Sequence, residues 1–408
     1  MMHDVTVSLV GERRAGASPE MLPEPILTSA TLEEALGQTL REALDLQQWD
    51  DHAGLQVMLE RIPSAIKKSV MAERKLHQAI RHNILQDLKH VPDAPPGVGV
   101  YAVDEKHQKA ARRNILLSGR VTAAEGANTG HDGVTATLVA VGVCLTRYDG
   151  AMHSWRTTFL RHDYSADHKD VVEGLRQFLD RRSARGSVNN RDQITSLLRR
   201  GIMASMERKA LLQRTSSPWR LGHGVPTPLE ILTGSGSMEL IDEMLPVLEQ
   251  LLLQEKRWVF VSERDANRAL LTIAGALEPG QIAILQKGKL VLQNMVERGT
   301  YDPVRKAKVL DFAEKLGESM IVGGLRATQS APAQLFFAHA EHALEAGVIA
   351  LADAALQPHR GYPLLLELAR LGAKTGLGIE SFSSLVEAAY SKERAAGQFS
   401  SGRILTPI

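Results

Sequence analysis

Asp104 ends an apolar run that could place it in a catalytic crevice. Residues 97–103 are apolar and rich in valine, follow two prolines and precede a charged segment. This pattern predicts a buried strand with Asp104 at its carboxyl end. Ligands and metals in α/β proteins bind beyond that end of the sheet, so Asp104 is a candidate catalytic residue. Many strands also end in an Asp that only caps a turn, and this alternative stays open.

Three further carboxylates stand where they could complete a site for a hard cation. Glu125 closes a strand-like run, Glu207 lies in a helix-like segment, and Glu230 interrupts the apolar run 227–232, which reads as a strand. Mg²⁺ and Mn²⁺ prefer oxygen ligands, and two such ions about 4 Å apart stabilise the attacking and leaving oxygens of a phosphodiester. Glu125 could be only a turn residue and Glu207 part of a solvated face, whereas a charge inside an apolar run is harder to dismiss.

The residues that other catalytic classes require are missing from the sequence. A single cysteine, Cys144 in an apolar run, excludes internal disulfides and thiolate metal sites and fits the core of a cytoplasmic protein. The sequence has no phosphate-binding loop for ATP hydrolysis, no serine-hydrolase elbow, and no zinc-protease or dinucleotide-binding motif. His339 and His342 could share a metal ion, but nothing nearby completes a zinc set.

A basic segment lies within a chain that is nearly neutral overall. The chain has 48 Lys and Arg against 47 Asp and Glu, so it carries no global field that would attract nucleic acid. Residues 161–220 hold thirteen Lys and Arg and seven Asp and Glu, a local charge of +6. A solvated helical face explains this segment about as well as a surface that binds DNA phosphates. The natural phosphate contacts are Arg181, Arg182, Arg199 and Arg200.

Hydrophobic periodicity divides the chain into four parts. Residues 1–30 are predicted to be an arm, residues 31–95 a helical region ended by prolines, residues 96–395 a large α/β domain with helical insertions, and residues 396–408 a tail. No stretch is apolar enough to cross a membrane, and no export signal is evident.

The large domain is predicted to be α/β, with a mixed sheet flanked by helices. Helices alternate with strands beyond residue 170, which predicts parallel strands joined by crossovers. Before that point, consecutive runs joined by short loops predict an antiparallel meander. The four runs are 97–104, 114–124, 135–148 and 155–161.

The order of these features resembles the NurA family of nucleases, whose fold is like that of ribonuclease H and the PIWI domain. That family has a strand ending in a metal-binding Asp, followed by Gly-Ser, and Asp104 matches this Asp. Glu207 matches a metal-binding Glu on a helix, and Glu230 matches an Asp in a Leu-Asp-Gly-Thr-like segment. Gly361-Tyr362-Pro363 matches a segment in which a His follows eight residues after the Tyr, a position that Arg370 holds here.

The resemblance implies cleavage of DNA, dependent on Mn²⁺ or Mg²⁺, as a single-strand endonuclease and a 5′-to-3′ exonuclease. It also implies a homodimer docked on a HerA-like hexameric ATPase, in DNA end processing, repair or antiviral defence. Because three of the four motifs are altered, a non-catalytic relative that binds DNA or scaffolds the ATPase remains an alternative. A different ribonuclease-H-like enzyme, such as one that cuts RNA, is a third possibility.

The same resemblance implies roles for individual residues. Tyr362 and Arg370 would contact or polarise the scissile phosphate, with Arg370 as an electrostatic substitute for an imidazole. The ions would be held by Asp104, Glu207 and Glu230, with Glu125 and Asp353 as further candidate ligands.

Overall fold

Two compact units, Met1–Glu73 and Arg74–Ile408, make up the chain. The first unit contains α1 (Ser29–Leu36) and α2 (Leu40–Ala43), each begun by a reciprocal capping box. Helix α3 (Leu55–Ile80) runs from this unit into the second. No helix in the part of the chain that the structure covers is both long and apolar enough to span a bilayer. The computed structural model describes residues 28–49, 55–90, 93–162, 164, 170–185, 193–262 and 267–393.

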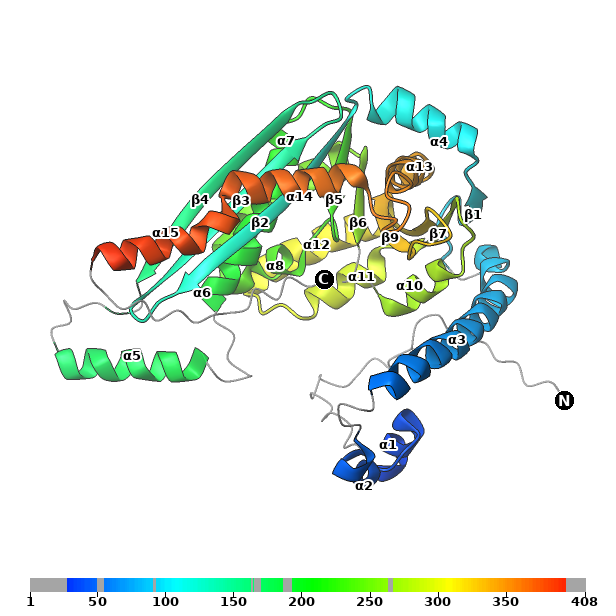
Figure 1. Ribbon diagram of the computed structural model, residues 1–408. Coiled ribbons are helices and arrows are strands. Elements are labelled where there is room, and N and C mark those ends of the chain that lie inside the picture. The colour runs from blue at the N-terminus through cyan, green and yellow to red at the C-terminus, as the bar shows by residue number, and fades with distance from the viewer. Residues whose placement is uncertain are drawn as a thin grey trace. The chain divides into compact units, whose positions relative to one another are not determined.

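One mixed nine-stranded sheet organises the second unit, in the order β1-β7-β8-β9-β6-β5-β2-β3-β4 (Figure 1). The pairs β2–β5 and β5–β6 are parallel and the remaining pairs are antiparallel, so the predicted mixed sheet is confirmed. The strands are β1 (Gly99–Ala102), β2 (Val121–Asp132), β3 (Ala136–Thr146), β4 (Met152–His162), β5 (Trp219–His223), β6 (Trp258–Ser262), β7 (Gln281–Lys287), β8 (Met320–Arg326) and β9 (Gln334–His339).

The predicted meander is correct for β2, β3 and β4 and wrong for β1. Strand β1 pairs with β7 at the opposite edge of the sheet. The reason is the helical segment between β1 and β2: α4 (Glu105–Ala111) continues as a wider turn through Leu116 and carries the chain to the far side of the sheet. Strand β2 also begins at Val121, later than predicted, and extends through the polar segment 126–132 that was expected to be a loop.

Helices cover both faces of the sheet. Helix α14 packs on one face of β2 and β3, and α7 packs on the other (Figure 1). Side chains alternate between the two faces of a strand, so neighbouring residues of β2 meet different helices. The remaining helices are α5 (Val171–Arg185), α6 (Gln193–Ser196), α7 (Ile202–Gln213), α8 (Leu229–Leu232), α9 (Met238–Leu248), α10 (Arg268–Gly275), α11 (Lys289–Val296), α12 (Pro303–Ser319), α13 (Ala343–Ala354), α14 (Leu364–Leu377) and α15 (Ile379–Lys392).

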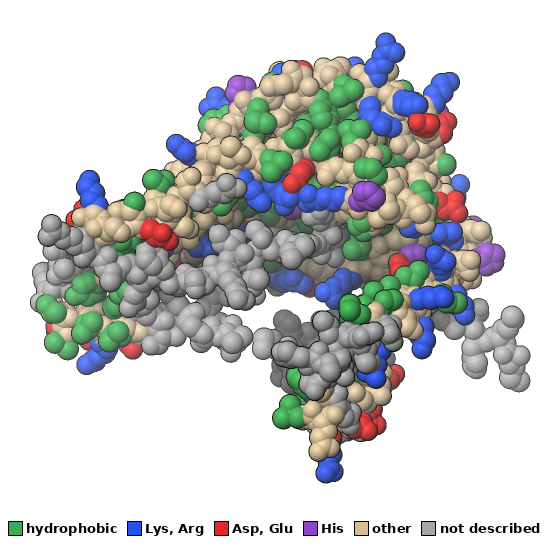
Figure 2. Space-filling view, in the orientation of Figure 1, with side chains coloured by type: hydrophobic (Ala, Val, Ile, Leu, Met, Phe, Trp, Pro, Cys, Tyr) green, Lys and Arg blue, Asp and Glu red, His purple; other side chains and the backbone are tan. Residues whose placement is uncertain are grey.

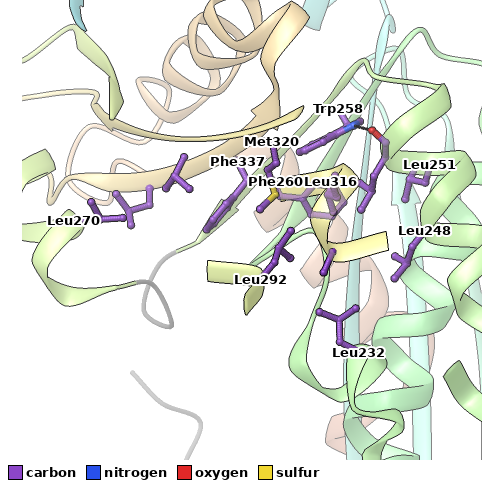
Figure 3. Packing of buried hydrophobic residues seen from close by; sticks show 14 of the residues in the cluster. Leu232, Leu248, Leu251, Trp258, Phe260, Leu270, Leu292, Leu316, Met320 and Phe337 are labelled. Atoms are coloured by element: carbon purple, nitrogen blue, oxygen red, sulfur yellow. Dashed lines mark hydrogen bonds between the residues drawn. The ribbon is translucent and has the colours of Figure 1, made fainter. Parts of the chain in front are cut away.

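A large apolar core anchors the central strands. Figure 3 shows Trp258 and Phe260 of β6 packed with side chains from β8, β9 and the helices on that face, and the Trp258 indole donates a hydrogen bond to the Leu252 carbonyl. Burying each such side chain stabilises the fold by about 1.5–3 kcal/mol. Cys144 is also buried, as predicted for a core cysteine. Strand β5 pairs with β6 and therefore lies directly beside this core.

Candidate functional site

Asp104 caps a helix at the edge of the sheet. Its Oδ1 accepts hydrogen bonds from the His107 backbone N–H at 2.8 Å and lies 2.7 Å from the His107 Nδ1. The side chain is 62% exposed, and these bonds lower the pKa of its carboxyl group. Strand β1 stands six strand positions from β2, about 29 Å at 4.8 Å per strand. The predicted grouping of Asp104 with Glu207 is therefore wrong, and the helix cap is its role.

Glu125 lies instead on β2, inside the sheet, where parallel pairing with β5 and antiparallel pairing with β3 meet. The parallel pairing of β2 with β5 ends at Ala124 and Gly222, so Glu125 and His223 are the next residues on their strands. Glu125 Oε1 is 3.6 Å from His223 Nδ1, and the Glu125 side chain is buried. Ala124 and Gly126 face α7, so alternation places the Glu125 side chain on the α14 face.

Glu207 approaches Glu125 from α7 through a gap left by a glycine. A Cβ at Gly126 would lie only 2.5 Å from Glu207 Oε1, so any other residue there would displace the carboxylate. The Gly126 backbone N–H donates a hydrogen bond to Glu207, whose side chain is buried. The prediction that Glu207 lies on a helix is confirmed, and the carboxylate beside it is Glu125 rather than Asp104.

Burial raises the pKa of both carboxyl groups, and the charge of Glu207 adds to the shift of Glu125. The pKa of Glu125 is raised well above its ordinary value, first by burial and then by the charge of Glu207, while Arg370 and Arg208 act in the opposite direction. Burial also raises the pKa of Glu207, and Arg208 opposes that shift. Groups shifted in this way are typical of sites where protons or cations are exchanged.

Arg208 is a buried positive group that contacts both Glu207 and the backbone around His223. Its guanidinium forms an ion pair with Glu207 and donates to the carbonyls of His223 (3.2 Å), Val225 (2.7 Å) and Pro226 (3.3 Å). It also lies over the Phe260 ring, 5.1 Å from the ring centre. The guanidinium is almost completely buried, so its positive charge is a permanent part of the site.

Tyr362 and Arg370 reach the same site from the C-terminal region. The Tyr362 hydroxyl is 2.7 Å from His223 Nδ1. Arg370 donates to Glu367 Oε1 at 2.6 Å, and its charge acts on Glu125. Arg360 donates to the other oxygen of Glu367 at 2.7 Å. Helix α14 thus brings a positive group to the face of the sheet on which Glu125 lies.

Asp353 positions α14 through hydrogen bonds to both of its carboxylate oxygens. Its Oδ2 accepts a hydrogen bond from the Leu365 backbone N–H at 3.0 Å, in the first turn of α14, and its Oδ1 accepts one from the Tyr148 hydroxyl at 2.5 Å. Both oxygens are therefore used by the fold. Burial raises the pKa of Asp353 to about 6. We correct its expected role from metal ligand to anchor of the helix that carries Arg370.

Glu230, Arg199 and Arg200 lie at the margin of the site. Glu230 is on helix α8, not on a strand as predicted, because Pro228 starts a helical turn there. It pairs with Arg200 at 3.7 Å. The Arg199 guanidinium lies against Gly130 of β2. Arg181 and Arg182 belong to α5, and their side chains fall outside the described residues.

We call the group formed by these residues the central cluster, and it fits one hard cation better than two. Among the residues that the structure describes, no three His, Cys, Asp or Glu side chains are placed to hold one ion. Within that same part of the chain, Glu125 Oε2 is buried without a hydrogen-bond partner. Mg²⁺-like cations often take one or two carboxylates and fill their remaining positions with water and phosphate oxygens. The members of the central cluster are Glu125, Glu207, Arg208, His223, Tyr362, Glu367 and Arg370.

Glu125 was among the further candidate ligands named from the sequence, whereas His223 was not, although the two positions share a local pattern. Glu125-Gly126 and His223-Gly224 each place a polar group directly before a glycine at the end of the β2–β5 pairing. His223 was not a candidate because only acids were sought at that position. The glycine was the usable signal, since it makes room for a neighbouring side chain.

Together the fold and the central cluster define a mixed α/β protein with buried acids and arginines where parallel and antiparallel pairing meet. The structure is similar to the crystal structure of the NurA nuclease from Sulfolobus solfataricus, with 10% identity, 83% of this chain and 97% of that chain covered, and a TM-score of 0.42. It is also similar to a crystal structure of NurA with manganese, with 10% identity, 80% and 98% covered, and a TM-score of 0.37. No family model and no curated protein matches the sequence.

Proposed function

We propose that this chain is a NurA-like nuclease that hydrolyses DNA phosphodiesters at the central cluster. The observation that carries the proposal is the pair of buried carboxylates, Glu125 on β2 and Glu207 on α7, beside His223. A protein buries two acids side by side at a cost in free energy, and such clusters are typical of active sites.

A divalent cation, Mn²⁺ or Mg²⁺, is part of this proposal. Glu125 Oε2, which has no hydrogen-bond partner among the described residues, is the oxygen that would hold it. When bound, such an ion activates a water molecule and offsets the negative charge that develops on the phosphate. A cation at Glu125 would also offset the repulsion between Glu125 and Glu207.

The neighbouring side chains supply phosphate binding and proton transfer. Arg370 is about one-third exposed, and its Nε has no partner among the described residues, so it can donate to a phosphate oxygen while Glu367 holds its Nη2. The His223 side chain is 41% exposed and is the proposed group that accepts and returns a proton. The Tyr362 hydroxyl orients the imidazole through Nδ1.

Basic side chains beside the central cluster are proposed to guide DNA to it. Figure 2 shows Lys and Arg side chains gathered in a band across the middle of the visible face, with a His and an acid next to them. Arg200 and Arg360 are exposed or partly exposed beside the cluster. Such side chains bind the phosphate backbone without reading sequence. Single-strand endonuclease and 5′-to-3′ exonuclease action are the proposed forms of cleavage.

The decisive experiment compares Glu125→Gln with Asp104→Asn in a cleavage assay on labelled single-stranded and double-stranded DNA with Mn²⁺. We expect Glu125→Gln to lose about 100-fold or more of the activity, because it removes the charge that holds the cation. Asp104→Asn keeps a good helix cap and should retain activity within about twofold. Activity that survives Glu125→Gln but not Asp104→Asn would contradict the proposed centre.

A non-catalytic DNA-binding role is the second candidate, and the charge balance of the site favours it. Four carboxylates, Glu125, Glu207, Glu230 and Glu367, face four guanidiniums, those of Arg200, Arg208, Arg360 and Arg370. Arginines can thus neutralise the site without a metal ion. DNA binding measured by fluorescence anisotropy, with no cleavage by the wild-type chain in Mn²⁺ or Mg²⁺, would support this candidate.

We further propose that the chain acts as a homodimer with a HerA-like hexameric ATPase. The sequence contains no phosphate-binding loop, so any ATP-driven movement of DNA requires a partner. Light scattering of the purified chain tests the dimer. Co-purification with a HerA-like protein, and stimulation of cleavage by ATP only in its presence, tests the partnership in end processing or defence.

A further inference from the structure

The Arg208 guanidinium contacts several oxygen atoms of the kind that a metal ion binds. Its guanidinium meets one oxygen of Glu207 and the backbone carbonyls of residues 223, 225 and 226. The charges of Glu125 and Glu230 also act on it. Carboxylate and carbonyl oxygens are the preferred ligands of hard divalent cations. A positive side chain therefore occupies a cage that would otherwise suit an ion.

Two glycines and an aromatic ring make room for this arrangement. A Cβ at Gly222 would collide with the Phe260 ring, over which the guanidinium lies. A Cβ at Gly126 would collide with Glu207, the acid that Arg208 pairs with. The placement of Arg208 thus depends on small residues on both strands, β2 and β5, that border the central cluster.

We propose that the Arg208 guanidinium takes the place of a second divalent ion, so that the central cluster binds at most one ion, at Glu125. This inference rests on the proposed function for the ion at Glu125, but the role of Arg208 is testable without any cleavage. Because a guanidinium stays protonated and cannot dissociate, the charge beside Glu207 is independent of metal concentration. Cleavage should then depend on the first power of free Mn²⁺ concentration.

The test is a titration of the full chain with Mn²⁺ alone, with free Mn²⁺ measured by electron paramagnetic resonance. We expect the wild-type chain to bind one ion that is lost in Glu125→Gln. Arg208→Met should bind one additional ion, and adding Glu207→Gln to that variant should remove it. Circular dichroism checks that each variant is folded.

Arg326→Met is the matched control. Arg326 donates to the carbonyls of Gly275, Leu277 and Gln329, much as Arg208 does to its three carbonyls, but β8 carries it away from the central cluster. We expect this variant to bind the same number of ions as the wild-type chain. A gain in Arg326→Met equal to that in Arg208→Met would assign the extra ion to a general loosening of the fold and overturn the proposal.

Two results overturn the proposal directly. One is a wild-type chain that binds two ions dependent on Glu125, and the other is a folded Arg208→Met that binds no more than the wild type. If Arg208→Met does not fold, the Mn²⁺ affinity of Glu207→Gln is measured instead. A change in affinity below twofold supports the proposal that Glu207 pairs with Arg208. A tenfold loss of affinity would make Glu207 a metal ligand and overturn the proposal. A wild-type chain that binds no ion contradicts the proposed metal-dependent nuclease, while a gain in Arg208→Met still supports this inference.

Discussion

Two acidic residues that were expected at the ends of strands, Asp104 and Glu125, have opposite surroundings in this molecule. Asp104 follows β1 at the edge of the sheet, where it is exposed and binds the first turn of a helix. Glu125 lies on β2 where the parallel pairing ends, and it is buried among other ionisable groups. The surroundings of an acidic residue on or after a strand therefore depend on where that strand lies in the sheet. That place is set by pairing partners distant in sequence.

The largest expected effect is on stability, from breaking the buried pair of Glu207 and Arg208. Removing one partner leaves a buried charge uncompensated, so Glu207→Ala should lower the free energy of unfolding by about 3–5 kcal/mol. Replacing both by Met should recover much of that loss. Urea unfolding measures the effect. His107→Ala, which removes the partner of Asp104 at the exposed edge, should change little, and equal losses at both places would abolish the contrast.

A smaller loss is expected from Gly126→Ala. Its Cβ would lie 2.5 Å from both Glu207 Oε1 and Met203 Cγ, so α7 side chains must move. Overpacking of this kind costs about 1–3 kcal/mol. Gly275→Ala is the control, since its nearest neighbour would be the end of the His77 side chain at 3.2 Å. Thermal unfolding compares the two variants, and a Gly126→Ala as stable as the control would mean that Glu207 does not depend on the glycine.

Asp353 should make stability depend on pH. Its pKa of about 6 in the folded chain lies above the ordinary value of 3.8, so the folded state holds the proton more tightly than the unfolded state. Its contribution is present in full below pH 3.8 and is lost as the pH rises through about 6. Between pH 5 and 7 the wild type should lose more stability than Asp353→Asn, as measured by urea unfolding. Parallel curves for the two proteins would contradict the assigned pKa.

The smallest effect is expected from Asp104→Ala. The pKa of Asp104 is lowered by its hydrogen bonds to His107, so its small contribution is present above the unfolded-state pKa and is lost as the pH falls. Hydrogen exchange should show faster opening of the first turn of α4, with cleavage and Mn²⁺ binding unchanged. A strong loss of cleavage would return Asp104 to the active centre and invert the comparison between the two acids.

Much of the local structure could be predicted from residue patterns. The runs 135–148 and 155–161 identified β3 and β4, and the helix-like segment around Glu207 is α7. These strands and this helix could be predicted because helix and strand periods depend on neighbours within a few residues. Tyr362 and Arg370 were named from the resemblance, and their roles stay predictions.

Local patterns could not predict which carboxylate, Asp104 or Glu125, is buried in the site, or that Arg208 is buried beside it. An Asp after a valine-rich run and a Glu before a glycine are both acceptable site residues when the sheet order is unknown. In the sequence, Arg208 belongs to a basic segment that a solvated helical face would explain. In the structure, it is buried against β5, β6 and the loop after β5. Both outcomes depend on burial, which is a property of the assembled sheet.

The sequence by itself determined the α/β class, the resemblance to NurA nucleases, and the candidate residues Glu207, Tyr362 and Arg370. Only the tertiary structure decided that Asp104 is a helix cap, that Glu125 and His223 meet at the end of the β2–β5 pairing, and that Arg208 lies in an oxygen cage. The physical reason is that secondary structure follows local periods, whereas strand order brings together residues about a hundred positions apart.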